Sequence, residues 1–139
     1  MIWGGVFDRH RSLRVSFVEI GIGWVAPLLE RMDDVWEQHR GWLQPPLARL
    51  PSEQFRDQCS ATFERDRAGI VTRAWAGTHS LMWATDYPHA ESSWPRSREI
   101  AEEQLGGLDA HERRRIAGAN VAELYAWEPR ALAAPWTSG

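Results

Sequence analysis

The sequence predicts an α/β domain in which parallel strands alternate with helices. Three apolar or β-branched stretches are each followed by a segment with helical spacing, in the order strand, helix, strand, helix, strand, helix. Because this alternation is typical of right-handed crossovers between parallel strands, we expect one parallel sheet with helices packed on it. Three such strands would leave two unpaired edges, so we expect an incomplete domain.

The length and composition are those of one globular unit. With 139 residues, of which 43% are hydrophobic and 25% charged, the chain can bury a single core. Its net charge is −3 and its basic residues are scattered, so we expect no nucleic-acid partner. We find neither a cationic leader nor a run of about 20 apolar residues, and therefore expect a cytoplasmic chain outside the membrane. Cys59 has no partner cysteine and is expected in the core.

The first strand–helix unit follows a helical stub at residues 3–9. Residues 14–20 predict a strand, because they are apolar and β-branched and lead into the tight turn Gly21-Ile22-Gly23. Apolar residues at three- and four-residue spacing from Val25 onward then predict a helix, which Gly41 would close with positive φ.

A loop and a short helix should connect this unit to the second strand. Residues 42–50 contain two prolines and predict the loop, and Ser52 is the expected N-cap of the short helix. Residues 58–63 predict the second strand. Asp66 can then cap a helix that runs to about residue 76 and ends at Gly77.

The third unit begins with a predicted strand at residues 80–85. A polar loop follows, and then a helix over residues 95–105 with a proline in its first turn. Asp109 with Glu112 has the pattern of a capping box, for a helix that ends near Gly118, and Asn120 with Glu123 repeats that pattern. We expect residues 128–139 to form a disordered tail.

Each predicted strand leads to an acid, namely Glu19, Glu64 and Asp86. The carboxyl ends of parallel strands share one edge of a sheet, where α/β proteins bind ligands, so the three carboxylates could converge. Such a cluster would suit a cation or acid–base catalysis. For Glu64 we favour a role at the start of the following helix, where the helix dipole stabilises acids. For Glu19 a structural ion pair with an arginine and a role in the site both stay open. For Asp86 we favour a role in the site.

The five histidines form no H-x-H, H-x-x-H or H-E-x-x-H pair, so by themselves they predict no metal site. His89 differs in its placement, because it follows Pro88 in the loop where the acids would converge. Its imidazole could there be a metal ligand, a base or a substrate contact. We expect His39 to pack or cap its helix. The other histidines are expected at solvent or cap positions, and no nucleotide-binding or nucleophile-elbow motif occurs.

Seven blocks, in the right order, resemble the carboxyl-terminal part of the amidohydrolase-related metal-dependent hydrolases. The resemblance is to the branch that includes aminocarboxymuconate-semialdehyde decarboxylase. The blocks are residues 5–10, 17–25, 29–33, 51–53, 82–89, 94–97 and 118–125.

This resemblance implies a (β/α)8 TIM barrel, of which residues 1–127 would form the last three strand–helix units. It also implies a divalent metal, usually zinc, at the carboxyl ends of the strands. Asp86 matches the family's aspartate ligand, whereas the H-x-H pair and a further histidine ligand have no counterpart in this sequence. The decarboxylase branch carries a histidine at the position of Glu19. His89 matches a histidine common among the relatives.

We therefore expect a fragment of a metal-dependent hydrolase or carboxy-lyase that acts on a small organic substrate. Asp86 would bind the metal and handle a proton, Glu19 would be a site acid and His89 a loop contact. The alternative is a catalytically inactive truncated or split-barrel chain, which needs a complementing chain for the remaining strands and ligands. The chain could also form a homo-oligomer, because apolar residues exposed on the edges of an incomplete barrel predict association. A free-standing binding module is the function that we favour least.

Overall fold

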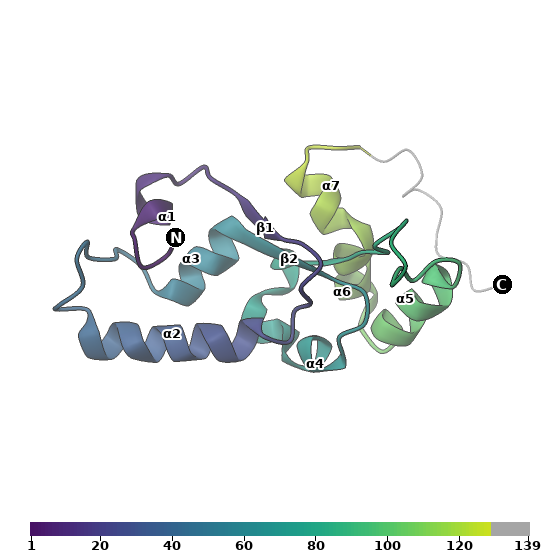
Figure 1. Ribbon diagram of the computed structural model, residues 1–139, viewed down its shortest axis with the longest axis horizontal. Coiled ribbons are helices and arrows are strands. Elements are labelled where there is room, and N and C mark those ends of the chain that lie inside the picture. Colours follow the sequence, from purple (N-terminus) through teal and green to yellow (C-terminus); the bar gives the residue numbers. More distant parts are fainter. Residues whose placement is uncertain (129–139) are drawn as a thin grey trace.

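A parallel sheet of three strands organises residues 1–128, which the computed structural model describes. The strands are β1 (Val15–Phe17), β2 (Cys59–Phe63) and β3 (Leu81–Trp83), and they lie side by side in the order β1-β2-β3 (Figure 1). Both pairings are parallel, with Phe17 beside Ala61 and Phe63 beside Trp83. The predicted α/β class is confirmed, and the carboxyl ends of all three strands meet at one edge.

Helices connect and flank the strands. Figure 1 shows α2 and α3 towards one end of the molecule, and α5, α6 and α7 towards the other, with the sheet between them. The helices are α1 (Val6–Arg9), α2 (Val25–His39), α3 (Pro51–Gln58), α4 (Arg67–Ala76), α5 (Ser97–Leu105), α6 (Ala110–Arg114) and α7 (Asn120–Leu124). A 3-10 turn at Thr78–Ser80 precedes β3, and a π turn at Arg115–Ala119 joins α6 to α7.

The core lies between the helices and one face of the sheet. Alternate strand residues point to opposite faces, and those at odd positions, such as Ala61 and Leu81, pack against Val25 and Phe55. Phe17 of β1 also lies 6.1 Å from Phe55, ring centre to ring centre, and stacks on it. The other face is more polar, and on it the Ser16 and Ser60 hydroxyls are hydrogen-bonded at 2.7 Å. The buried cluster comprises Phe7, Ile22, Val25, Leu29, Phe55, Cys59, Ala61, Phe63, Ala76, Leu81, Leu105 and Ile116.

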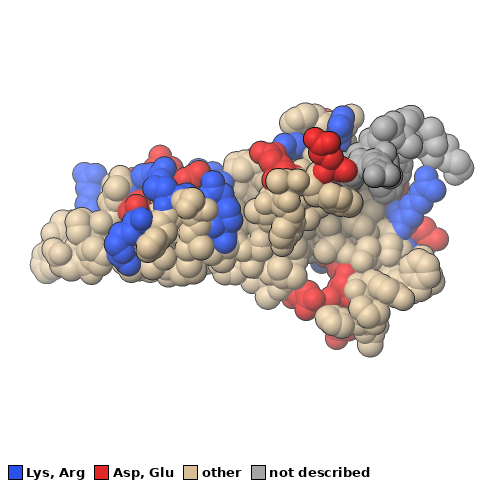
Figure 2. Space-filling model, turned by 90° about the horizontal axis from the view of Figure 1, so that it is seen from above, with Lys and Arg blue, Asp and Glu red and all other residues tan. Residues whose placement is uncertain are grey.

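Ion pairs hold α1 against α3. Arg49, in the loop before α3, lies 3.4 Å from Asp8 of α1 and 2.9 Å from Asp57 of α3. On the face that Figure 2 shows, basic and acidic side chains lie next to one another over this end of the molecule. Of the arginines here, Arg49 and Arg11 are paired with carboxylates, and Arg9, Arg14 and Arg56 donate to backbone carbonyls.

Two predicted strands are too long. The predicted strand at residues 14–20 is three residues long in the structure, and the one at residues 80–85 is reduced to Leu81–Trp83. The physical reason is the same for both strands. Glu19, after β1, and Asp86, after β3, adopt left-handed backbone conformations with φ of 63° and 55°. An extended strand cannot pass through such a residue, so the chain turns there. The second strand starts one residue later than predicted.

Several predicted helix ends are also wrong. The first long helix ends at His39, and Gly41 is not in the left-handed region. Ser52 is not an N-cap, since α3 has Leu50 at that position, and the backbone N–H of Leu50 donates to the Glu53 carboxylate at 3.2 Å. The backbone N–H of Ser52 donates instead to Asp33 of α2 at 2.9 Å. This hydrogen bond joins α3 to α2, a contact that the local sequence pattern of either helix does not predict.

The helices after β3 differ more strongly from the prediction. The predicted helix at residues 95–105 begins at Ser97, two residues later than expected. Asp109 caps α6 as predicted, but the helix does not end near Gly118 and continues through the π turn into α7. Asn120 is not a cap. Its buried amide donates to the carbonyls of Thr78 and Leu81 at 2.8 and 2.7 Å and fastens α7 to the start of β3.

Three further predictions concern Cys59, the tail and the membrane. Cys59 is buried in the core, as expected, and burial raises the pKa of its thiol to about 12, which leaves it protonated and unreactive at neutral pH. The predicted tail lies outside the described residues from position 129 onward. Among residues 1–128, no helix combines the length and the apolar character that a membrane crossing requires.

Candidate metal centre

Three side chains that the sequence singled out meet at the carboxyl edge of the sheet. Glu19 follows β1, and Asp86 and His89 follow β3. The Nδ1 atom of His89 lies 2.8 Å from Asp86 Oδ1 and 3.7 Å from Glu19 Oε1. One ligand atom from each of the three residues lies within 4.8 Å of the other two, and no other such group of His, Cys, Asp or Glu occurs in residues 1–128. We call Glu19, Asp86 and His89 the carboxylate–histidine cluster.

The backbone turns these side chains towards one point. Glu19 and Asp86 are two of the three non-glycine residues with positive φ in the described chain. The turn at Glu19 is held by its backbone N–H, which donates to the Thr62 hydroxyl of β2 at 3.0 Å. The turn at Asp86 is held by the backbone N–H of His89, which donates to the Asp86 carbonyl at 3.0 Å. Strained conformations of this kind persist only where the surroundings fix them, and they concentrate at functional sites.

The cluster lies between the protein interior and solvent. The Asp86 side chain is 14% exposed, whereas Glu19 and His89 are 52% and 62% exposed. A hydrogen bond with Asp86, and then the negative charge of Asp86, raises the pKa of Glu19, while His89 acts in the opposite direction. The site therefore crowds negative charge, which a bound cation would relieve.

A hollow of about 360 Å³ opens beside the cluster. Its lining includes the carboxylates of Glu19, Glu64, Asp86 and Glu91, with Arg65 as the one basic residue among the described residues that line it. The predicted convergence of Glu19, Glu64 and Asp86 is thus observed in the lining, although Glu64 does not join the cluster. Burial, and then Asp86, raises the pKa of Glu64. Glu91 also lines the hollow, and its only signal in the sequence is its place in the polar loop after Asp86.

Asp66 fastens the loop that contains Glu19 to the start of α4. One carboxylate oxygen accepts the backbone N–H groups of Ile22 and Gly23 at 2.7 and 2.6 Å. The other accepts the N–H of Gly69 at 2.8 Å, which is the predicted N-cap of α4. Gly21 has a φ of 69°, and a Cβ there would lie 2.9 Å from the same carboxylate. The Gly-Ile-Gly turn is therefore fitted closely around Asp66, a role that the capping pattern did not reveal.

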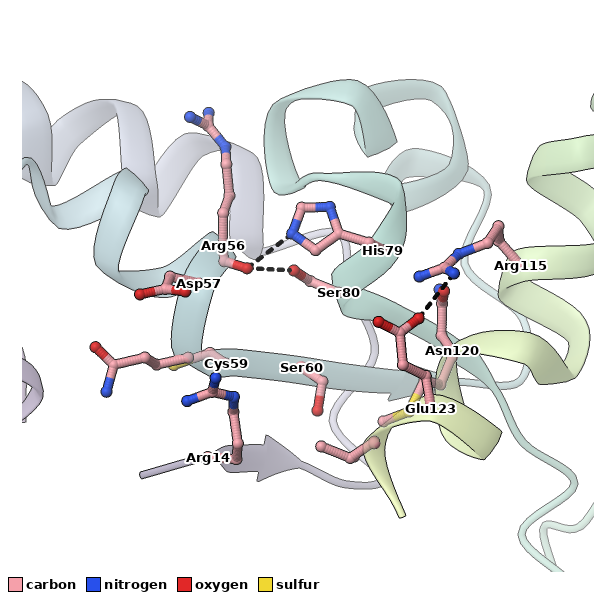
Figure 3. Close-up of a pocket in the computed structure, with 13 residues that line it drawn as sticks. Arg14, Arg56, Asp57, Cys59, Ser60, His79, Ser80, Arg115, Asn120 and Glu123 are labelled. Atoms are coloured by element: carbon pink, nitrogen blue, oxygen red, sulfur yellow. Dashed lines mark hydrogen bonds and ion pairs between the residues drawn. The ribbon is translucent and has the colours of Figure 1, made fainter. Parts of the chain in front are cut away.

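A second hollow, of about 340 Å³, lies near the amino ends of β2 and β3. In Figure 3 the His79 ring and the Ser80 hydroxyl meet the Arg56 carbonyl, and Arg115 pairs with Glu123. The Arg56 guanidinium points away, and it donates to the Trp75 carbonyl. Most polar groups here are already partnered, so we do not regard this hollow as a catalytic site.

The histidines outside the cluster serve local structure. His39 is the last residue of α2, and its carbonyl accepts the backbone N–H of Trp42. His111 lies in the first turn of α6 and donates its backbone N–H to Asp109 at 2.9 Å. His79, described above, lies at the amino ends of the strands. His79 and His111 lie at solvent or cap positions, as expected, whereas His39 is exposed and α2 has Arg40 as its C-cap.

Comparison with protein families identifies the chain. The model of the amidohydrolase family matches residues 1–127. A search of curated proteins gives no match. Among solved structures, the 5-carboxyvanillate decarboxylase from Sphingomonas paucimobilis superposes with a TM-score of 0.76 at 24% sequence identity, over 92% of this chain and 38% of that one.

Two further structures agree with this fold. An amidohydrolase from Mycobacterium avium subsp. paratuberculosis has a TM-score of 0.73 at 24% identity, over 89% of this chain and 31% of that one. A dihydroxybenzoic acid decarboxylase from a Polaromonas species, solved with bound manganese and 2-nitroresorcinol, has a TM-score of 0.70 at 18% identity, over 90% and 37%.

The chain thus spans less than two fifths of the length of these solved proteins, at 31% to 38%. The three parallel strand–helix units are correspondingly part of a TIM barrel, as the resemblance implied. With the family model matched over residues 1–127, the chain belongs to the amidohydrolase family.

Proposed function

We propose that the protein is a metal-dependent decarboxylase that acts on a small, carboxylated organic compound. The observation that carries the proposal is the meeting of Glu19, Asp86 and His89 at the carboxyl edge of the sheet, beside an open hollow. In TIM barrels this edge carries the catalytic residues. Solved decarboxylases of similar fold support carbon–carbon cleavage over hydrolysis, although the fold by itself does not determine the reaction.

The donor atoms of the cluster suit a divalent cation. Two carboxylates and one imidazole are ligand types that both manganese and zinc accept. Asp86, the least exposed of the three side chains, would hold the cation, as the family resemblance implies. When bound, such a cation polarises a substrate oxygen and neutralises developing negative charge.

The chain's own residues would orient the substrate. The Asp86 carboxylate accepts a hydrogen bond from His89 Nδ1 at 2.8 Å when that nitrogen carries the proton, which fixes the imidazole ring. Glu19 lines the hollow from the β1 side, and Glu64 lines it from the β2 side. A substrate carboxylate would be repelled by these acids unless a cation were present, so we expect substrate binding to depend on the metal.

A direct assay tests the proposed reaction. The purified protein, supplied with Mn²⁺ or Zn²⁺, is incubated with a panel of hydroxybenzoates and a parallel panel of lactones and amides. We expect carbon dioxide release from one or more of the acids, and its loss in Asp86→Asn. Hydrolysis without carbon dioxide release would replace decarboxylation by hydrolysis, and no turnover of either panel would refute the proposal.

We propose as the alternative function that the chain works only with a polypeptide that supplies further strands. The supporting observation is the three-stranded sheet, in which β1 and β3 are the outer strands of the described chain. Val18 and Ile20, which follow β1, are each 54% exposed. If no strand bearing an H-x-H pair is encoded beside this chain in any frame, the split-barrel idea loses its basis. A catalytically active monomer in analytical ultracentrifugation would also contradict it.

A further inference from the structure

We infer that Glu19 and His89 are themselves cation ligands, so that the carboxylate–histidine cluster holds one divalent cation using only residues of this chain. This inference rests on the proposed function for the presence of a metal, and it adds two ligands to Asp86. It also makes Glu19 a metal ligand, whereas the sequence predicted a site acid at this position and the decarboxylase branch carries a histidine there.

The distances within the cluster are those of a site close to its bound geometry. Ligand atoms about 2.1 Å from a common ion lie about 3.0 to 3.4 Å from one another in octahedral or tetrahedral arrangements. The separations of His89 Nδ1 from Asp86 Oδ1 and from Glu19 Oε1 are 2.8 and 3.7 Å, on either side of that range. All three ligand atoms lie within 4.8 Å of one another, so rotation of the exposed Glu19 and His89 side chains would admit the ion.

The two added ligands are held by different parts of the fold. Glu19 is fixed through its backbone N–H to Thr62 of β2, and its loop is fastened to α4 by Asp66. His89 is fixed through its backbone N–H to the Asp86 carbonyl. Both anchors use main-chain bonds, which leaves the Glu19 carboxylate and the His89 ring available as ligands. Coordination through His89 Nδ1 would replace the hydrogen bond of that nitrogen to Asp86, because a ring nitrogen binds a metal only without its proton. Preorganised ligands of this kind reduce the ordering cost of binding.

The charge around the cluster favours a cation, but charge alone would not require these particular ligands. Glu64 and Glu91 line the same hollow without belonging to the cluster. Glu64 is therefore a matched control. Its replacement by glutamine removes one negative charge from the hollow and leaves the three ligand atoms in place, whereas Glu19→Gln removes the same charge together with a ligand.

The experiment measures Mn²⁺ binding to the full chain, without any substrate. Free Mn²⁺ is followed by its electron paramagnetic resonance signal, and stoichiometry is checked by calorimetry. We expect one ion per chain, a loss of affinity of about tenfold or more in Glu19→Gln and in His89→Gln, and a change below about threefold in Glu64→Gln. Circular dichroism melting curves verify that each variant is folded. Glu19 and His89 are more than half exposed, which favours folding of their variants.

The outcomes separate this inference from the proposed function. Equal weakening by Glu19→Gln and Glu64→Gln would mean that the negative field, and not coordination, attracts the ion, and it would overturn the inference. Unchanged affinity in Glu19→Gln or His89→Gln would do the same, yet would leave an Asp86-centred enzyme intact. No Mn²⁺ binding by the wild-type chain at millimolar concentration would also overturn it. Conversely, binding with the expected variant pattern, but without turnover of any acid, would support the inference and refute the decarboxylase.

Discussion

The replacement Asp66→Ala is expected to destabilise the fold far more than the loss of an ordinary helix cap. The Asp66 carboxylate accepts three backbone N–H groups at 2.6 to 2.8 Å, two from the turn after β1 and one from α4. A hydrogen bond to a charged group contributes about 1.5 kcal/mol or more, so three amount to about 4.5 kcal/mol. Because Asp66 is partly exposed and water can replace some of these bonds, we expect a loss of about 3 kcal/mol in the free energy of unfolding.

Urea unfolding, followed by circular dichroism, measures this loss. For a urea dependence of about 2 kcal/mol per molar, the midpoint should fall by about 1.5 M. Asp109→Ala is the matched control, since Asp109 also caps a helix and accepts two backbone N–H groups, but both belong to its own helix. The control should lose less stability, because Asp109 accepts two bonds instead of three and is exposed, so that water can replace them. Equal losses in the two variants would refute the idea that Asp66 joins α4 to the turn that carries Glu19.

Three further predictions concern the packing and capping of the helices. Gly69→Ala should destabilise the fold by about 1 to 3 kcal/mol and lower its melting temperature, because a Cβ there would clash with the Ile22 side chain and lie 2.9 Å from the backbone nitrogen of Gly23; an unchanged melting curve would contradict this close approach. The hydrogen bond from the backbone N–H of Glu112 is the main cause that lowers the pKa of Asp109 below its usual value of 3.8. The ionised Asp109 carboxylate should therefore stabilise the fold above pH 3.8, and this stabilisation should be lost as the pH falls through the lower pKa of the folded state. The stability difference between wild type and Asp109→Asn should therefore vanish in strong acid, and a difference that persists there would show that the charge is not responsible. Asn120→Ala should cost about 2 to 4 kcal/mol in urea unfolding, since it leaves two carbonyls without their donor, and a cost below about 1 kcal/mol would mean that water replaces the amide.

The order of strands and helices could be predicted from the sequence, because it depends on local periodicity. The second strand, the Asp66 cap and the Gly77 stop are close to their predicted positions. The strand ends were overestimated, since an apolar run continues past the residue where the backbone turns. Nothing in the local pattern distinguishes Phe17, in the strand, from Val18, which is outside it.

The helix that follows Asp109 shows a second limit of local patterns. The Asn120 and Glu123 spacing has the form of a capping box, yet the helix runs on and Asn120 is buried against β3. A buried amide with two carbonyl partners contributes more than a cap at the surface, so the tertiary contact prevails. The Thr78 and Leu81 carbonyls are about 40 residues away in the sequence, at separations of 42 and 39.

The sequence by itself determined the α/β class, the acid after each strand and the family to which the chain belongs, because these depend on periodicity and on ordered motifs. It could not decide which acids would meet. Glu19 and Glu64 both follow a strand, yet only the tertiary structure brings Glu19 to Asp86 and His89 and leaves Glu64 in the wall of the hollow. The physical reason lies in the left-handed turns at Glu19 and Asp86, which depend on contacts with Thr62 and within the loop after β3.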